Sequence, residues 1–234
     1  CLDSITVSVV DVPDFVIDTA VCSSYDFAGN TITTTGTYYD TLTANSGCDS
    51  LIVLNLHVDN QSVYHVSQTG NDSNSANVLA PLQNIQTALN RACDGDTVLV
   101  ASGTYYEHLD MGYKKITLIG AGADSTVIDA QNQGMGLIIR SSQASVVGFG
   151  FKNGGAPNYN IKWVSSYGYH NVPTGILSGD QSQQPLIKNC AVYDNQTGIY
   201  GNAVVEESRV YNNTIGLQGY WISPQISQSA FYGN

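Results

Sequence analysis

The sequence predicts an all-β protein in which a small β-sandwich-like module precedes a parallel β-helix that carries an N-terminal capping α-helix. Three observations lead to this fold class. A nine-residue phrase recurs near the C-terminus, apolar residues follow helical spacing in one short segment, and two cysteines, Cys22 and Cys48, enclose a strand-rich segment. Each observation predicts one part of the architecture.

The recurring phrase predicts stacked coils. It occupies residues 187–195, 205–213 and 226–234. Its aligned columns are Ile187/Val205/Ile226, Cys190/Ser208/Ser229, Val192/Val210/Phe231, Tyr193/Tyr211/Tyr232 and Asn195/Asn213/Asn234. One such unit is too short to bury its apolar side alone, whereas stacked copies bury it against each other. We therefore expect coils of a parallel β-helix with a ladder of asparagines along the axis. A β-sandwich with accidental similarity between the copies is the alternative.

Period-2 alternation and β-branched and aromatic residues identify these phrases as strands. Gly and Asn end each phrase, where the chain has to turn. A second phrase follows the first two copies, at 198–201 and 216–219, and Thr174-Gly175-Ile176-Leu177 parallels Thr197-Gly198-Ile199-Tyr200. These segments predict a further strand in each coil.

Composition narrows the class of protein. Charged residues are only 12% of the chain and the net charge is −11, so a nucleic-acid partner is disfavoured, since phosphate binding needs clustered Lys and Arg. No apolar run is long enough to span a bilayer. Abundant Gly, Ser, Thr, Asn and Tyr suit an extracellular β-rich protein, so we expect a secreted or cell-surface location. The chain opens on Cys1 without a signal peptide, so a targeting segment would lie outside it.

The predicted domains are residues 1–11, the last strand of a preceding β module; 12–59, a small β-rich module; and 60–234, the N-terminal part of the β-helix. The opening segment 1–10 reads like 48–57, so we expect this chain to be a piece of a longer polypeptide. Five cysteines leave at least one unpaired.

The module at 12–59 has a small core, and such domains usually need a covalent staple. Its expected strands are Phe15–Val21, Ser24–Phe27, Thr31–Thr34, Thr37–Thr43 and Leu51–Val58, with a hairpin turn at Gly29-Asn30. A Cys22–Cys48 disulfide would supply the staple, worth about 3 kcal/mol in the loop-entropy model. Two free buried cysteines are the alternative.

The module contains several distinctive phrases, which are Cys22, Gly29-Asn30-Thr31, Gly36-Thr37-Tyr38-Tyr39-Asp40 and Gly47-Cys48-Asp49-Ser50-Leu51. In these phrases the module resembles tandem β-rich repeats of large secreted Bacteroidota proteins. The resemblance implies a spacer or stalk.

A second resemblance rests on residues 64–73, 80–89 and 94–107, which look like the N-terminal opening of the right-handed parallel β-helix family, the pectate-lyase-like superfold. Helical spacing of Leu82, Ile85, Ala88, Leu89 and Ala92 predicts a helix over 82–92. An open β-helix end exposes unpaired edges and apolar core, so this helix is the expected cap. We expect Cys93, at its end, to be a small buried hydrophobe.

The coils that follow have their own predicted strands. These are Thr97–Val100, Ile116–Ile119, Val127–Ile128, Leu137–Ile139 and Val146–Phe151.

Residues 156–173 interrupt the coils with a long aromatic-rich segment. Its candidate glycan-binding residues are Tyr159, Lys162, Trp163, Tyr167, Tyr169 and His170. In the β-helix family, ejected loops lie over the lateral face where sugar chains bind, which is what the resemblance implies for this segment. The alternative is that these aromatics pin the loop to the coil wall.

Catalysis has weaker support. The resemblance implies a Lys or Arg base in lyases and paired carboxylates in hydrolases. The available groups are Lys152, Lys162, His170, Asp180, Lys188, Asp194, Glu206, Glu207 and Arg209. Adjacent Glu206 and Glu207 should point to opposite faces of a strand, and Lys188 should pair with Glu206 across stacked coils. No catalytic motif of the family matches residue by residue, so we predict no catalytic residues.

We expect no cofactor. Calcium is the one ion considered, because Asp94-Gly95-Asp96 and Asn71-Asp72-Ser73 are rich in oxygen, but neither is an EF-hand or a nonapeptide calcium repeat. O-glycosylation candidates, in Asp-Ser/Thr-apolar triplets that resemble the Bacteroidota motif, are Ser4, Thr19, Thr41, Ser50 and Thr97.

The sequence therefore favours a non-catalytic section of a large secreted or surface protein: an adhesin, stalk or fibre component. Expected partners are carbohydrate or other cell-surface components, or further copies of the same chain. The alternative is the N-terminal part of a polysaccharide lyase or glycoside hydrolase.

Overall fold

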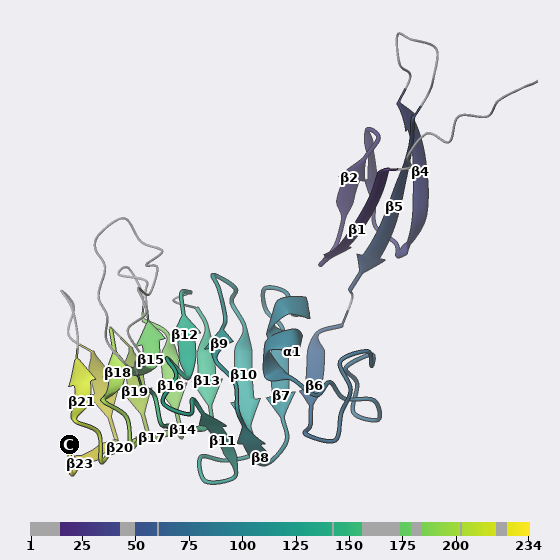
Figure 1. Ribbon diagram of the computed structural model, residues 1–234. Helices are drawn as coiled ribbons and strands as arrows, with labels where there is room; N and C mark the ends of the chain where they lie inside the picture. Colours follow the sequence, from purple (N-terminus) through teal and green to yellow (C-terminus); the bar gives the residue numbers. More distant parts are fainter. Residues whose placement is uncertain are drawn as a thin grey trace, which may run out of the picture. The chain divides into compact units, whose positions relative to one another are not determined.

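The computed structural model consists of two compact units, Cys1–Asn60 and Gln61–Asn234 (Figure 1). It describes residues 15–42, 50–59, 61–141, 143–155, 174–178, 184–201, 203–218 and 224–234. Almost every described element is a strand, and the fold class predicted from the sequence is confirmed.

The first unit contains a sheet of order β1-β5-β4 and a hairpin of β2 and β3. The strands are β1 (Phe15–Val21), β2 (Tyr25–Phe27), β3 (Asn30–Ile32), β4 (Gly36–Leu42) and β5 (Ser50–Val58). All five predicted strands are present with small shifts at their ends. The hairpin turn lies one residue earlier than predicted, at Ala28-Gly29, where both residues have positive φ. Leu54, Leu56 and Phe27 centre the small core.

Cysteines both confirm and correct the sequence analysis. Cys22 is disulfide-bonded, as predicted. Its predicted partner Cys48 lies outside the described residues, so that pairing stays a prediction. Cys93 is also disulfide-bonded and only half buried, so its prediction as a small buried hydrophobe was wrong. Sequence spacing gave no sign of this bond.

Three parallel sheets form the second unit, a right-handed parallel β-helix (Figure 1). The first sheet has β6 (Val63–Val66), β7 (Thr97–Val100), β10 (Thr117–Gly120), β13 (Ser145–Val147), β16 (Leu186–Lys188), β19 (Val204–Glu206) and β22 (Gln225–Ser227). The second has β8 (Gly103–Tyr105), β11 (Thr126–Asp129), β14 (Gly150–Lys152), β17 (Ala191–Tyr193), β20 (Arg209–Tyr211) and β23 (Ala230–Tyr232). The third has β9 (Leu109–Asp110), β12 (Leu137–Ile139), β15 (Thr174–Ser178), β18 (Thr197–Tyr200) and β21 (Ile215–Gln218).

Strand registers reproduce the predicted columns. Ile187 pairs with Val205 and Val205 with Ile226, while Val192, Val210 and Phe231 are successive partners in the second sheet. Ile176 pairs with Ile199, as the shared phrases predicted. The repeat is therefore the axial period of the coils.

A corner between two sheets explains the main error in the predicted strands. The predicted strand Val146–Phe151 is two strands, β13 and β14, in different sheets. Gly148, with φ 75°, turns the chain between them. In later coils Asn189, Glu207 and Gln228 occupy the matching corner with φ near 50°. The apolar run conceals the corner because residues on both sides point into the core.

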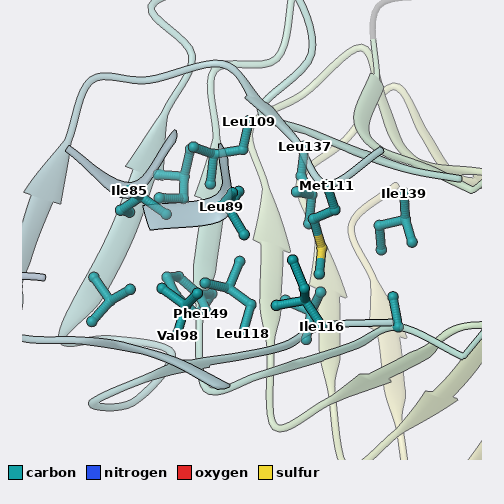
Figure 2. Packing of buried hydrophobic residues seen from close by; sticks show 14 of the residues in the cluster. Ile85, Leu89, Val98, Leu109, Met111, Ile116, Leu118, Leu137, Ile139 and Phe149 are labelled. Carbon is teal, nitrogen blue, oxygen red and sulfur yellow. The ribbon is translucent and has the colours of Figure 1, made fainter. Parts of the chain in front are cut away.

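The interior is a continuous stack of apolar side chains. Figure 2 shows Leu118, Ile116 and Phe149 packed together, with Ile85 and Leu89 beside them. Ile85 and Leu89 come from α1 (Ile85–Arg91), which is shorter than the predicted 82–92. Because both are buried in the same cluster as the strands, the helix covers the apolar core at this end, as the sequence predicted.

Side chains from neighbouring segments hold both ends of α1, a feature that the sequence analysis missed. The Glu107 carboxylate accepts the backbone N–H groups of Ile85 and Gln86, both at 2.9 Å. At the other end the Lys114 ammonium donates to the carbonyl groups of Leu89, Asn90 and Ala92 at 2.8–2.9 Å. These are the backbone groups that a helix leaves unpaired, so the two side chains stabilise a helix too short to persist alone.

Glu107 gives the fold a testable dependence on pH. Burial raises its pKa above the ordinary value of 4.5, and it outweighs the two N–H hydrogen bonds. The folded state therefore holds a proton that the unfolded state has released just above pH 4.5, so stability decreases as pH rises through the raised pKa. We expect thermal melting of the wild type to shift upward as the pH falls from 7 toward 4.5, and Glu107→Gln to lack this shift.

Below pH 3.8 the melting temperatures of the wild type and of Glu107→Gln should depend on pH in the same way. Burial works to raise the pKa of Asp72, Asp110 and Asp129, but hydrogen bonds to each carboxylate lower it overall. Their contribution is present above the unfolded pKa of 3.8 and is lost as the pH falls through the lowered values. Identical melting profiles of wild type and Glu107→Gln between pH 4.5 and 7 would contradict the assignment.

Candidate functional site

The predicted glycan-binding residues Tyr159, Lys162, Trp163, Tyr167, Tyr169 and His170 lie outside the described residues, so their role stays a prediction. The described chemistry of the C-terminal coils lies in rows of equivalent side chains along the axis. These are a serine row, an asparagine row and a tyrosine row. A cluster of one lysine and two glutamates and two single ion pairs lie in addition to the rows.

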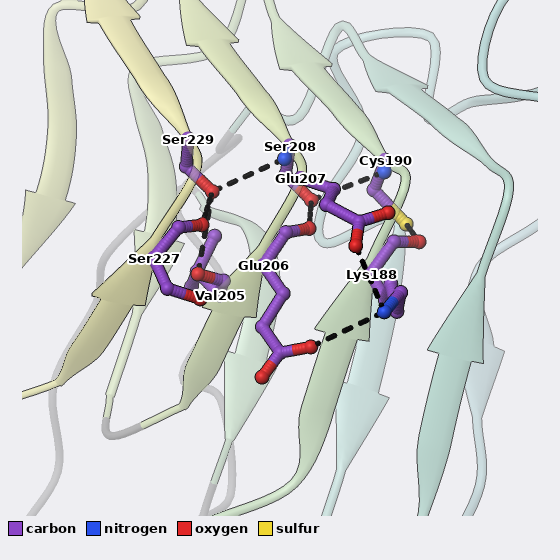
Figure 3. A network of polar contacts seen from close by, with 8 residues as sticks. All are labelled: Lys188, Cys190, Val205, Glu206, Glu207, Ser208, Ser227 and Ser229. Atoms are coloured by element: carbon purple, nitrogen blue, oxygen red, sulfur yellow. Dashed lines mark hydrogen bonds and ion pairs between the residues drawn. The ribbon is translucent and has the colours of Figure 1, made fainter.

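The lysine–glutamate cluster consists of Lys188, Glu206 and Glu207 (Figure 3). Lys188 Nζ lies 3.4 Å from Glu206 Oε2, which confirms the predicted pair, and 3.0 Å from Glu207 Oε1. The prediction that the two glutamates point to opposite faces was wrong. Glu207 follows the strand in a left-handed corner with φ 48°, so strand alternation does not apply to it. The ammonium holds both carboxylates, and hydrogen bonding to Glu207 raises the Lys188 pKa.

The serine row joins successive corners (Figure 3). The Ser208 hydroxyl accepts the Cys190 backbone N–H at 3.1 Å and donates to the Glu206 carbonyl at 2.7 Å. Ser229 repeats the arrangement toward Ser208. Cys190 is the buried, free member of this row, and burial raises its pKa to about 11. It therefore remains a thiol at neutral pH and is unsuited to nucleophilic chemistry.

The asparagine row confirms the predicted ladder. Asn195 Nδ2 donates to Asn213 Oδ1, and Asn213 Nδ2 donates to Asn234 Oδ1, each at 2.9 Å. The same oxygens accept the backbone N–H groups of Asn195 and Asn213 at 3.1 Å. Gly154 continues the row by donating its N–H to Asn195 Oδ1 at 2.7 Å. The amides thus connect four coils inside the wall.

The tyrosine row lies on the outer face of the second sheet. The rings of Tyr193 and Tyr211 stack with centroids 5.0 Å apart, and those of Tyr211 and Tyr232 stack at 5.1 Å. The interplanar angles are 4° and 3°. Tyr211 therefore has both ring faces covered by its neighbours. Sugar rings stack on open aromatic faces, so this row stabilises the coils and offers little stacking surface to a ligand.

The remaining candidate acids and bases form separate pairs. Lys152 lies 3.4 Å from Asp129, and Arg209 of β20 lies 2.6 Å from Asp124, in the loop before β11, which is three strands away in the second sheet. Neither cation shares its site with the lysine–glutamate cluster. Lys162, His170 and Asp180 lie outside the described residues.

The acidic segments considered for calcium have structural contacts. Asp72 accepts the backbone N–H groups of Gln83 and Asn84 at 2.9 Å, and Asp96 accepts that of Cys93 at 2.6 Å. Asp94 accepts the N–H of Lys115 at 3.0 Å. Within the described part of the chain, no three His, Cys, Asp or Glu side chains gather where they could hold a metal ion.

The O-glycosylation candidates stay predictions. Thr41 is exposed, Thr19, Ser50 and Thr97 are half-buried, all four lie in strands, and Ser4 lies outside the described residues.

One buried group in the third sheet is unsatisfied. Thr197 is 1% exposed, and its buried hydroxyl has no hydrogen-bond partner among the described residues. An unpaired buried polar group costs about 1–3 kcal/mol. We therefore expect Thr197→Val to raise the melting temperature of the β-helix, as measured by circular dichroism, whereas Thr214→Val, at an exposed position, should leave it unchanged. A lower melting temperature for Thr197→Val would show that the hydroxyl does have a partner.

Comparisons with known proteins give similar structures only. No protein-family model matches the sequence, and no curated protein matches it. Pectin methylesterase PemA from Erwinia chrysanthemi is 14% identical with a TM-score of 0.44, over 72% of this chain and 53% of that one. A lacto-N-biosidase of family GH136 from Eubacterium ramulus is 15% identical with a TM-score of 0.44, over 67% of this chain and 34% of that one. A pectin methylesterase in complex with hexasaccharide VII is 12% identical with a TM-score of 0.44, over 73% of this chain and 54% of that one.

This chain thus spans about half, or less, of the length of these three structures. The β-helix assignment rests on the strand registers themselves.

Proposed function

We propose that the chain is a non-catalytic section of a large secreted or cell-surface protein, in which the β-helix acts as an adhesin, stalk or fibre component. The observation that supports this best is that the polar groups described in the C-terminal coils interact with one another. Asparagines, serines and tyrosines bond or stack along the axis, and Lys152, Lys188 and Arg209 each pair with a carboxylate. A general acid or base has to be free to reach a substrate proton, and these groups are held by one another.

Two further features fit an extracellular setting. Cys22 and Cys93 are disulfide-bonded, and disulfides persist in oxidising compartments. In the described part of the chain, no helix is long and apolar enough to cross a membrane. Glycan contact through the 156–173 segment is part of the proposal, because aromatic and polar residues together suit sugar recognition.

A paired assay tests the proposal. The purified chain is incubated with pectin, polygalacturonate and neutral polysaccharides, and bond cleavage, methanol release and co-sedimentation are measured. We expect co-sedimentation without any product. Trp163→Ala should reduce co-sedimentation, and Tyr113→Ala, at an exposed tyrosine elsewhere in the unit, should not.

Each contrary result removes a stated part of the proposal. Product formation that depends on the chain would overturn the non-catalytic assignment and favour the lyase or hydrolase alternative. Unchanged co-sedimentation of Trp163→Ala would overturn glycan contact through the 156–173 segment.

A further inference from the structure

A polar cavity of about 280 Å³ opens beside the first coil of the β-helix, next to the N-terminal side of α1. Its walls come from the segment after β6, the residues before α1, and β8 with the residues that follow it. The side chains used below are Gln68, Gln83, Asn84, Thr104, Tyr106 and Glu107. This volume is just below the range of about 300–1,000 Å³ that is usual for ligand pockets, so it suits one small molecule.

The walls are fixed before any ligand arrives. Gln68 Nε2 donates to the Thr104 carbonyl at 2.6 Å and joins two walls. Asn84 is held through its backbone N–H and its amide by Asp72. Glu107 is held by the N–H groups of α1. A preformed site loses little entropy when a ligand binds.

Several lining groups keep unused hydrogen-bonding capacity. Among the described residues, the side chains of Gln83, Thr104 and Tyr106 have no hydrogen-bond partner, and each Glu107 oxygen accepts a single N–H. The set therefore includes amide and hydroxyl groups that donate and accept, and a carboxylate that accepts. Tyr106 is among the lining residues and is 64% exposed, so its side chain is accessible to a ligand.

We infer that this cavity binds one neutral sugar ring or a polyol of similar size. Hydroxyl groups of such a ligand can donate to Glu107 and accept from the amide of Gln83, while a C–H face of the ring lies against Tyr106. None of the lining residues belongs to the 156–173 segment, so this inference does not depend on the proposed function.

Charge decides between a neutral and an acidic ligand. Glu107 lines the cavity, Asp72 lies behind Asn84, and no Lys or Arg is among the lining residues. A carboxylate on the ligand would be repelled in this setting, because no cation compensates it. Burial raises the pKa of Glu107, because the charged carboxylate loses solvation there. A hydroxyl group of a neutral ligand that donates to Glu107 would stabilise this charged form.

Saturation-transfer NMR with the whole chain tests the inference. The probes are galactose, glucose and N-acetylglucosamine as neutral sugars and galacturonic acid as the acidic one, at pH 7. We expect at least one neutral sugar to bind with a dissociation constant on the order of millimolar, as the size of a single ring implies. Galacturonic acid should bind at least about fivefold more weakly than the corresponding neutral sugar, galactose.

Matched variants locate the site. Tyr106→Ala and Gln83→Ala should each weaken binding about fivefold or more, the loss expected for one stacking or hydrogen-bond contact. Tyr113→Ala replaces a tyrosine that is 61% exposed and does not line the cavity, and it should bind like the wild type. Melting curves confirm that each variant is folded.

Three results would overturn the inference: no binding by any neutral sugar, equal binding of galacturonic acid and galactose, or unchanged binding by both Tyr106→Ala and Gln83→Ala. Loss of monosaccharide binding in Tyr106→Ala should leave polysaccharide co-sedimentation through the 156–173 segment intact. Failure of this site and failure of the proposed function are therefore separate outcomes.

Discussion

Phe149→Ala should lower the free energy of unfolding of the β-helix by about 3–5 kcal/mol. Phe149 is fully buried, and its ring centroid lies 5.8 Å from that of Phe151. It follows the Gly148 corner and belongs to the same buried apolar cluster as Val98 and Leu118, so its removal leaves a cavity in a close-packed core (Figure 2). Urea unfolding measured by tryptophan fluorescence reports on this unit, since both tryptophans, Trp163 and Trp221, belong to it.

Phe149→Leu is the matched control, because it keeps most of the apolar volume. It should cost less than about 2 kcal/mol. Equal losses for the alanine and leucine variants would contradict the packing account, since they would show that the ring itself, and not the filled volume, is what the site requires.

Asn213→Ala should have the second-largest effect, a loss of about 3 kcal/mol. The side chain is 3% exposed and accepts two hydrogen bonds from Asn195, while its amide donates to the carbonyl groups of Val192 and Tyr211. Its removal leaves buried donors and acceptors on two coils without a partner, which is costlier than losing the average hydrogen bond. Gel-filtered, folded variant protein is unfolded in urea and compared with the wild type.

Gln196→Ala provides the control for this ladder. Gln196 is exposed and adjoins Asn195, so the change should stay within about 0.5 kcal/mol. If Asn213→Ala proved as mild as Gln196→Ala, the asparagine row would not stabilise the coils as we describe.

The stacked coils could be predicted because repeated columns carry their own register. Once Val192 and Val210 are known to be equivalent, parallel stacking follows, and so do the asparagine ladder and the Lys188–Glu206 pair. Corners could not be predicted in the earlier coils. The run Val146–Phe151 is apolar throughout, and only the backbone of Gly148 shows where one sheet ends and the next begins.

The supports of α1 were missed for a different reason. Glu107 and Lys114 lie about one coil after the helix in sequence and have no fixed spacing to its ends. Their role appears only when the coil returns beneath the helix. Glu207 was misplaced because a rule for strands was applied to a corner residue. The cavity beside α1 was missed likewise, since its walls come from three separated segments.

Cysteine cross-linking across two coils tests the central claim, the axial stacking of the repeat, most directly. Glu206 and Ser227 are register partners in neighbouring parallel strands of the first sheet. The experiment uses a Cys190→Ser background, which removes the free thiol and introduces the residue that Ser208 and Ser229 supply in the same row. In this background, the double variant Glu206→Cys with Ser227→Cys should form a disulfide readily, because adjacent strands are about 4.8 Å apart. The comparison pair, Glu206→Cys with Thr214→Cys, joins a residue of the first sheet to the residue just before β21 of the third sheet, and it should not form a disulfide. Rapid cross-linking of the first pair alone is the predicted result; equal yields from both pairs, or none from the first, would contradict the stacked β-helix.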